Sequence, residues 1–177
     1  YEEEVVMALQ GWSQATGAND TIRVAIVGLG GKRQRHKDGE AFTVDGGKGS
    51  HMIKEFNDPE KGAKVVALCD PDSRNIERDL KQFEGGKEKV EGYADVRKVL
   101  ERKDIDAVYI ASCNHWHALM TVWACQAGKD VYVEKPISHN IWEGRKMVEA
   151  TRKYNRIVQA GTGMRSDSSR RESIKYV

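Results

Sequence analysis

One seven-residue stretch of the sequence ends in an acid, a base and a proline, and these residue types at that place could meet a ligand. The stretch is DVYVEKP, from Asp130 to Pro136. It begins as a run of β-forming residues, and its proline cannot donate a hydrogen bond to a neighbouring strand, so a strand is predicted to end there. Glu134 and Lys135 would then stand at the carboxyl end of that strand, where open parallel sheets bind their ligands. The alternative is an ordinary Glu-Lys pair on the protein surface.

A glycine loop follows an earlier strand-like run and could hold a phosphate. The run IRVAIVG ends at Gly28, and Gly30 and Gly31 follow at once. Because glycine allows unusual backbone angles and has no Cβ, the backbone amides of such a loop can approach a pyrophosphate closely. The third glycine of the dinucleotide-binding pattern G-x-G-x-x-G would fall at position 33, which is Arg33. The simple pattern therefore fails here.

An insertion accounts for the broken pattern. A second glycine cluster begins at Gly46 and directly precedes a helix-like stretch. We therefore place an insertion at about residues 32–48, between the glycine loop and its helix, which is longer than most connections of this kind. Its basic run, Lys32 to Lys37, is interpreted either as a solvated loop or as a patch that binds phosphate or nucleic acid.

The acid at the end of the next predicted strand bears on the choice of cofactor. The run AKVVALCD ends at Asp70. In a dinucleotide-binding fold an acid at this place accepts hydrogen bonds from the ribose hydroxyls and repels a 2′-phosphate, which favours NAD. Arg74 follows four residues later and could reach a 2′-phosphate, so NADP stays open. A helix is predicted next, with Asp72 or Ser73 as its cap.

The segment CNHWHA, from Cys113 to Ala118, follows the strand-like run DAVYIAS and is rich in polar side chains. We predict that Asn114 caps the helix that follows. A metal site would need a fourth ligand besides Cys113, His115 and His117, and no residue is spaced to supply one. Contacts with an organic ligand are therefore favoured over a metal.

Two helices are predicted on either side of DVYVEKP, each with its bulky apolar residues in the core. The second of them begins with Asn140 and Glu143 in the spacing of a capping box. The residues predicted to be buried are Trp116, Leu119, Val122, Trp123 and Ala127 in the first helix and Ile141, Val148 and Tyr154 in the second.

The composition excludes several classes of protein. The 29 Lys and Arg residues against 27 Asp and Glu residues give a net charge of only +2, so there is no bulk electrostatic case for nucleic acid or a membrane as partner. The three cysteines are widely spaced, which argues against a disulfide framework and against a zinc site. No apolar run is long enough to span a bilayer.

Strand and helix patterns alternate along the chain, with five clear strands and a doubtful one in GGKEKVEGY. This alternation predicts an α/β fold with a doubly wound, mostly parallel sheet of the Rossmann type. We place that domain at residues 21–165, after an amino-terminal arm at residues 1–20. Residues 166–177 are assigned to the start of a linker or helix leading to a carboxyl-terminal domain.

Together these motifs resemble the amino-terminal domain of the Gfo/Idh/MocA oxidoreductases, the group of glucose-fructose oxidoreductase and inositol dehydrogenase. The resemblance rests on VAIVGLGG, the acid in ALCDPD, YADV, NHWHA, EKP with the helix SHNIWEGRKMVEA, and IVQAGTGMRS. The combination of EKP with N-H-x-H-A one βα unit earlier is specific, whereas the glycine loop alone is weak. Other wording, such as CQAGKDVYVEKPISHN, is similar to a bacterial branch whose members often carry an export signal, so both cytoplasm and periplasm stay open.

The resemblance implies a role for each matching position. The residues that would hold the dinucleotide are Gly28, Gly30 and Gly31 at the pyrophosphate, Asp70 at the adenosine ribose, and Asn114, His117 and Glu134 at the nicotinamide half. Lys135 would be catalytic, because a cation beside the carbinol oxygen stabilises the developing alkoxide while hydride leaves the same carbon. Arg33 and the insertion depart from the family pattern, and they leave the phosphate contacts open.

The implied activity is that of an NAD(P)-dependent oxidoreductase acting on a sugar or polyol-like alcohol, with NAD as the expected cofactor. In this family a second α/β domain binds the substrate and usually supplies a histidine partner for the lysine. We expect that domain beyond Val177, with any oligomer contacts, and we expect the 177-residue chain alone to bind dinucleotide without appreciable turnover. The alternative is a non-catalytic dinucleotide-binding module.

Overall fold

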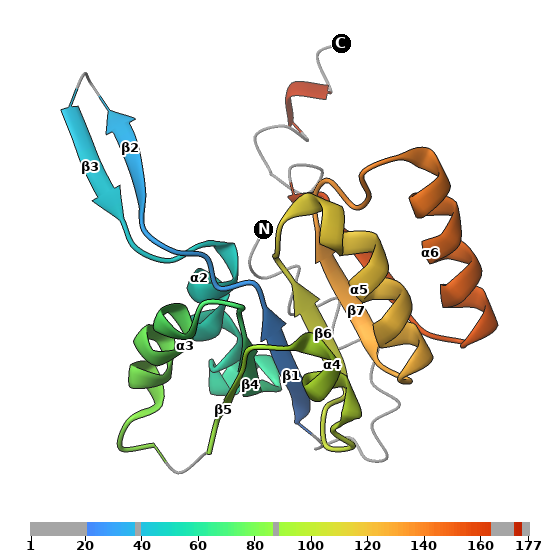
Figure 1. The fold of residues 1–177 in the computed structure, drawn as a ribbon, viewed down its shortest axis with the longest axis horizontal. Coiled ribbons are helices and arrows are strands. Elements are labelled where there is room, and N and C mark those ends of the chain that lie inside the picture. The colour runs from blue at the N-terminus through green and yellow to red at the C-terminus, as the bar shows by residue number, and fades with distance from the viewer. Residues whose placement is uncertain (1–20, 38–39, 87–88, 164–171, 175–177) are drawn as a thin grey trace.

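The computed structural model describes residues 21–37, 40–86, 89–163 and 172–174 (Figure 1). The strands of its main sheet are β1 (Ile22–Val27), β4 (Ala63–Cys69), β5 (Glu91–Tyr93), β6 (Ala107–Ile110), β7 (Asp130–Glu134) and β8 (Val158–Gly161). They are all parallel and lie in the order β5-β4-β1-β6-β7-β8. This is the Rossmann order, in which the chain reverses its direction of travel between β1 and β6 and opens a crevice at their carboxyl ends. The predicted fold class is confirmed, and the doubtful strand is the edge strand β5.

Helices cover both faces of this sheet (Figure 1). The helices are α2 (Lys48–Phe56), α3 (Ser73–Leu80), α4 (Val96–Glu101), α5 (Asn114–Gln126) and α6 (Ile141–Lys153), with short 3-10 turns η1 (Pro59–Lys61) and η2 (Lys81–Phe83). Alternate residues of the strands serve two apolar cores: Ile26 and Tyr109 pack on the side of α2 and α3, and Val27 and Ile110 on the side of α4, α5 and α6. Because both faces are covered, β1 is apolar along almost its whole length.

The insertion forms a β-hairpin. Strands β2 (Arg33–Lys37) and β3 (Glu40–Val44) pair in antiparallel fashion, and the hairpin projects away from the sheet beside α2 (Figure 1). The prediction located the insertion, but its interpretation of Lys32 to Lys37 as a loop is wrong, because most of that run lies in β2.

The two ends of the hairpin meet, so the insertion leaves the glycine loop closed. Gly47 donates a backbone hydrogen bond of 2.6 Å to the carbonyl oxygen of Leu29. A Cβ built on Gly30 would lie 2.7 Å from Gly47 Cα, and one built on Gly49 would lie 2.2 Å from the carbonyl oxygen of Gly28. In the dinucleotide-binding pattern the third glycine allows the helix to pack closely on the strand. Gly49, in the first turn of α2, fills that place from the far side of the hairpin.

Two helix faces differ from the prediction. The inner face of α5 is formed by His117, Ala118, Thr121, Ala124 and Cys125, and that of α6 by Met147 and Ala150. The predicted core residues Trp116, Leu119, Ile141 and Val148 are 41%, 41%, 93% and 40% exposed. The prediction followed bulky apolar side chains, but α5 lies against the sheet, α4 and α6 at once, and small residues permit that close approach.

The predicted ends of the domain are only partly visible. Residues 1–20 and most of 166–177 lie outside the described residues. Within the described ranges, no helix has the length and apolar character needed to cross a membrane.

Replacing Gly49 by alanine tests the close contact between α2 and the glycine loop. Alanine normally favours a helix over glycine by about 1 kcal/mol. At Gly49 the new Cβ would collide with backbone, so we expect Gly49→Ala to lower the free energy of unfolding by about 2–3 kcal/mol. The matched control is Gly144→Ala in α6, where the Cβ would meet only the rotatable Ser138 hydroxyl at 3.2 Å. Urea unfolding of both variants measures the difference, and equal effects would contradict the assigned role of Gly49.

Candidate active site

The predicted site residues gather at the carboxyl edge of four neighbouring strands, with Asp70 after β4 and the others after β1, β6 and β7. β1, β6 and β7 are adjacent in the sheet, and the glycine loop, the Ser112–Asn114 segment and Lys135 follow them in turn. A Cβ on Gly28 would lie 2.5 Å from Ser112 N, so the glycine loop packs directly on the segment after β6. The structure therefore brings together motifs that are far apart in the sequence.

The glycine loop has a shape that only glycine permits. Gly28 and Gly30 have φ angles of 89° and 71°, in the left-handed region, and neither has room for a Cβ. Such a loop lets the backbone approach a pyrophosphate closely. The residues present therefore fit a dinucleotide.

Asp70 lies beneath this loop and braces it. One oxygen, Oδ2, accepts hydrogen bonds from the amides of Leu29 at 2.8 Å and Gly30 at 3.3 Å. The other, Oδ1, accepts from Asp72 N and Asn75 Nδ2, both at 3.0 Å. The carboxylate is buried, with 6% of its residue exposed, and four donors match the capacity of its two oxygens. The structure thus places Asp70 at the glycine loop, and its hydrogen bonds to the loop amides fix the shape of that loop.

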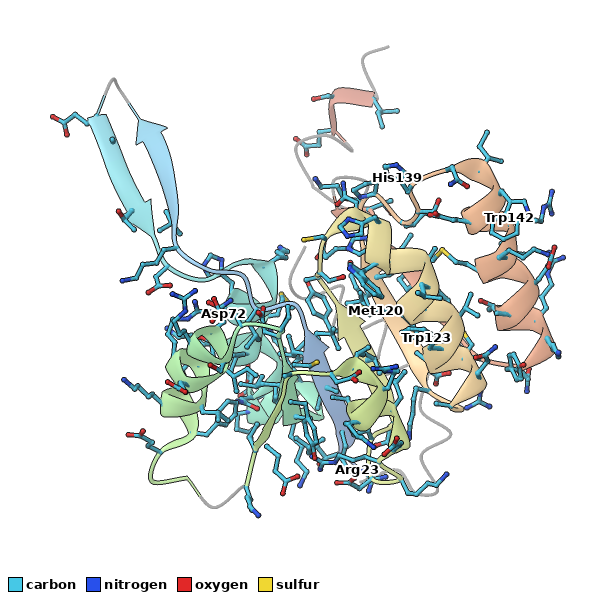
Figure 2. All side chains as sticks on the ribbon, viewed as in Figure 1. Arg23, Asp72, Met120, Trp123, His139 and Trp142 are labelled. Carbon is cyan, nitrogen blue, oxygen red and sulfur yellow. The ribbon has the colours of Figure 1, made fainter. Side chains whose placement is uncertain are left out.

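The start of α3 presents an exposed ion pair beside Asp70. Asp72 caps the helix as predicted, accepting from Arg74 N, and the Arg74 guanidinium binds its carboxylate with both Nε and Nη2. These hydrogen bonds lower the pKa of Asp72. The Arg74 side chain is 85% exposed, and Figure 2 shows Asp72 near the base of the hairpin.

Glu134 is anchored in the interior. Its Oε1 accepts a hydrogen bond of 2.5 Å from the hydroxyl of Tyr109, and the residue is only 7% exposed. Tyr109 in turn stacks on Tyr132 and meets Phe56 edge-on, with ring centroids 5.5 Å apart in both cases. The alternative of a surface Glu-Lys pair is therefore wrong for Glu134. Sequence reasoning missed Tyr109, whose only signal was a hydroxyl in an otherwise apolar strand.

His117 links the ends of β6 and β7 from inside the protein. Its Nδ1 lies 2.7 Å from the carbonyl oxygen of Pro136, and its Nε2 lies 2.9 Å from that of Ser112. A neutral imidazole donates to one of these oxygens, and an imidazolium donates to both. With 1% of the residue exposed, His117 fixes the segment that carries Lys135.

Lys135 and Asn114 are exposed at the same edge. The peptide between Lys135 and Pro136 is cis. The prediction that Asn114 caps α5 is wrong: Cys113 occupies the cap position without a side-chain hydrogen bond, and Asn114 is the first helical residue. The Asn114 side-chain amide therefore does not cap the helix.

The predicted pairing of Asn140 with Glu143 at the start of α6 is confirmed, but the reciprocal bond of the box goes to the amide of His139 and not to that of Asn140. Asn140 Oδ1 accepts from Glu143 N at 2.9 Å, and Glu143 Oε2 accepts from His139 N at 2.8 Å. This pair fixes the start of the helix that follows EKP. The exposed His139 and Trp142 mark this turn in Figure 2.

The cysteines near the site do not form a metal centre with the histidines. Cys69 is buried, and burial together with the charges of Asp70 and Asp95 raises the pKa of its thiol to about 12. In the part of the chain that the structure describes, no three His, Cys, Asp or Glu side chains are grouped to hold a metal ion.

Comparison with known proteins identifies the family. The sequence profile described as "Oxidoreductase family, NAD-binding Rossmann fold", of the Gfo/Idh/MocA type, matches residues 22–162. The chain belongs to this family. It is an NAD-binding Rossmann domain, as the sequence analysis expected.

Curated relatives include an inositol 2-dehydrogenase/D-chiro-inositol 3-dehydrogenase of Shouchella clausii, 30% identical over 84% of this chain and 38% of the relative. Another is glycosyl hydrolase family 109 protein 1 of Bacteroides thetaiotaomicron, 39% identical over 76% of this chain and 27% of the relative. The chain thus spans well under half the length of these proteins.

Solved structures agree in fold. The scyllo-inositol dehydrogenase of Lactobacillus casei with bound NAD(H) and scyllo-inositol has a TM-score of 0.71 and 25% identity, over 87% of this chain and 40% of that one. The myo-inositol 2-dehydrogenase of Lactobacillus plantarum has a TM-score of 0.71 and 26% identity, over 88% and 40%.

Removing the buried imidazole tests its linking role. We expect His117→Ala to lower the free energy of unfolding by about 2–4 kcal/mol, because it opens a cavity and removes the imidazole donor from the backbone carbonyl oxygens that it contacts. The control is His139→Ala, an exposed histidine on the neighbouring turn, which should change stability by less than about 0.5 kcal/mol. Chemical denaturation measures both, and a His117→Ala variant as stable as the control would contradict this assignment.

Proposed function

We propose that the chain is the nucleotide-binding part of an NAD-dependent oxidoreductase that acts on a sugar or polyol-like alcohol by hydride transfer. The observation that carries the proposal is the exposed Lys135, which follows β7 at the same edge of the sheet at which the glycine loop follows β1. The inositol dehydrogenases among the relatives support a polyol as the class of substrate.

The proposed roles follow the three segments of the site. Gly28, Gly30 and Gly31 approach the pyrophosphate, and the exposed Asn114 lies toward the nicotinamide half. His117 and Glu134 lie toward the nicotinamide half of the cofactor as well. Because both are buried, we assign them the role of fixing the backbone of the site, with little direct contact with the cofactor.

Lys135 is the proposed catalytic residue. A bound NAD would supply the acceptor for the hydride of the carbinol carbon. The Lys135 ammonium donates a hydrogen bond to the carbinol oxygen and stabilises the negative charge that develops there, while the hydroxyl proton passes to the histidine that the second domain of the family is expected to supply. The Tyr109–Glu134 and His117–Pro136 contacts keep the strand end fixed during this step.

Cofactor choice tests the role of Asp70. We expect the chain to bind NAD more tightly than NADP, because a buried carboxylate under the loop disfavours the extra negative charge of a 2′-phosphate. If Asp70 excludes that phosphate, Asp70→Asn brings the two affinities together. If Asp70 only braces the loop, the variant weakens both cofactors equally and their ratio stays constant. Calorimetric titration of both cofactors separates these cases, and tighter binding of NADP to the unchanged chain would contradict the choice of NAD.

A second candidate function is glycoside cleavage, which the 39% identity with the family 109 glycosyl hydrolase favours. NAD-dependent glycosidases are known in other families. The two functions differ in one measurement on the whole protein. A dehydrogenase accumulates NADH, seen by its absorbance, when given polyols. A glycosidase releases the aglycone of an aryl glycoside without net NADH. We expect net NADH, and loss of it in Lys135→Met; aglycone release without NADH would favour the second function.

A further inference from the structure

A charged network lies beneath the glycine loop at positions outside the family motifs. Its centre is Arg78 on α3, whose side chain is 23% exposed. The two hydrogens of Arg78 Nη1 are shared among three acceptors, which are the carbonyl oxygen of Gly30 at 2.9 Å, Asp45 Oδ1 at 2.9 Å and Asn75 Oδ1 at 3.2 Å. Arg78 therefore contacts the glycine loop directly, together with the end of the hairpin.

The other side of the guanidinium is fixed by a buried carboxylate. Nε and Nη2 of Arg78 bind the two oxygens of Asp79, each at 2.9 Å. Asp79 is 1% exposed and also accepts from the hydroxyl of Ser50 in α2, at 2.9 Å. All three guanidinium nitrogens are thus engaged, and the network joins α3 to both the glycine loop and α2.

These contacts lie where the hairpin is inserted between the glycine loop and α2. In an uninterrupted dinucleotide-binding pattern, a few residues connect the first glycines to the helix. Here the hairpin separates them, and Arg78 holds Gly30, before the hairpin, and Asp45, after it, on one nitrogen. The side chain supplies across space the constraint that a short chain connection would otherwise supply.

We propose that Arg78 is a positioning residue for the dinucleotide, which keeps the split glycine loop in the shape that receives a pyrophosphate. The inference rests on the proposed function, because it assumes that this loop binds the cofactor. It goes further by assigning the task to a residue on α3 and by making the Asp45 end of the hairpin part of the site. Arg78 itself need not touch the cofactor.

The fork of the guanidinium is what this role requires. A planar guanidinium holds a carboxylate with two nitrogens while its third reaches another acceptor, whereas a lysine ammonium is a single point of charge. Lysine at position 78 would retain the charge and could pair with Asp79, but it could not hold Gly30 and Asp45 as well. Arg78→Lys therefore separates geometry from charge.

The matched control is Arg23 at the opposite end of β1, labelled in Figure 2. Its Nε and Nη2 bind the two oxygens of Asp106 at 3.0 and 2.8 Å, in the same forked geometry. Arg23→Lys thus breaks an ion pair of the same geometry, although a more exposed one, at the end of β1 away from the glycine loop. Its effect on cofactor affinity shows how much is lost when a forked ion pair is broken away from the site.

The experiment compares ligand binding by Arg78→Lys, Arg23→Lys and the unchanged chain. We expect Arg78→Lys to weaken both NAD and ADP-ribose by about tenfold or more, the effect of losing one hydrogen bond to a charged group. Arg23→Lys should weaken them by less than about twofold, since surface substitutions away from a site have small effects. Adenosine, which has no pyrophosphate, should bind all three proteins alike. Calorimetry or competition with a fluorescent nucleotide measures these affinities.

Amide hydrogen exchange gives a second readout without ligand. If Arg78 closes the loop, the Gly47 amide, which bonds to Leu29 O, exchanges faster in Arg78→Lys and is unchanged in Arg23→Lys. Should Arg78→Lys fail to fold, Asp45→Ala tests the same contact from the hairpin side and should weaken NAD by a smaller factor.

The outcomes are distinct. If the unchanged chain binds neither NAD nor ADP-ribose, the proposed function fails and this inference fails with it. If the unchanged chain binds both and Arg78→Lys binds them equally well, only this inference is overturned. Equal losses in Arg78→Lys and Arg23→Lys would also overturn it, because they would show a general effect of stability.

Discussion

The buried carboxylate of Asp70 is the interaction on which the rest of the site depends. A glycine loop alone is a flexible segment, because glycine loses more conformational freedom on folding than any other residue. Asp70 offsets this by accepting from two loop amides and from two donors at the start of α3. Adjacent strands β1 and β4 thereby end in one hydrogen-bonded unit. A carboxylate in this place shapes the cofactor site even before it meets a ribose.

The same principle holds on the other side of β1. His117 and Glu134 are buried polar groups: Glu134 accepts a hydrogen bond from Tyr109 in the neighbouring strand, and His117 contacts the carbonyl oxygens of Ser112 and Pro136 in the loops after β6 and β7. Buried polar groups with their partners restrict a segment to one arrangement, since any shift would leave them unpaired at a cost of about 1–3 kcal/mol each. The backbone at Lys135, the exposed residue of EKP, is consequently fixed by the hydrogen bonds of its buried neighbours. The buried neighbours of Lys135 thus fix the backbone from which its exposed side chain extends.

What the sequence predicted well are features with a local or periodic cause. Strands buried on both faces are continuous apolar runs, so β1, β4, β6 and β7 were predictable, and the Asn140–Glu143 pairing follows from spacing alone. The inner face of α5 was not, because small residues such as Ala118 and Ala124 pack closest while Trp116 remains 41% exposed. The strand RQRHK of the hairpin has no apolar alternation, so its pairing with EAFTV left no signal. Asp70 meets Leu29 from 41 positions away, beyond any sequence window.

The split glycine pattern shows why spacing is a weak guide to such a site. A dinucleotide requires that glycines meet in space, and the usual short spacing is only the simplest way to bring them together. Here the Gly47–Leu29 hydrogen bond closes the base of a hairpin, and Gly49 packs on Gly28 as closely as the third glycine would. Any insertion whose ends meet in this manner leaves the loop intact while the sequence motif disappears. The physical requirement is close backbone contact at the end of β1, which Gly47 and Gly49 make here, and the Arg78 side chain from α3 adds a hydrogen bond to the same loop.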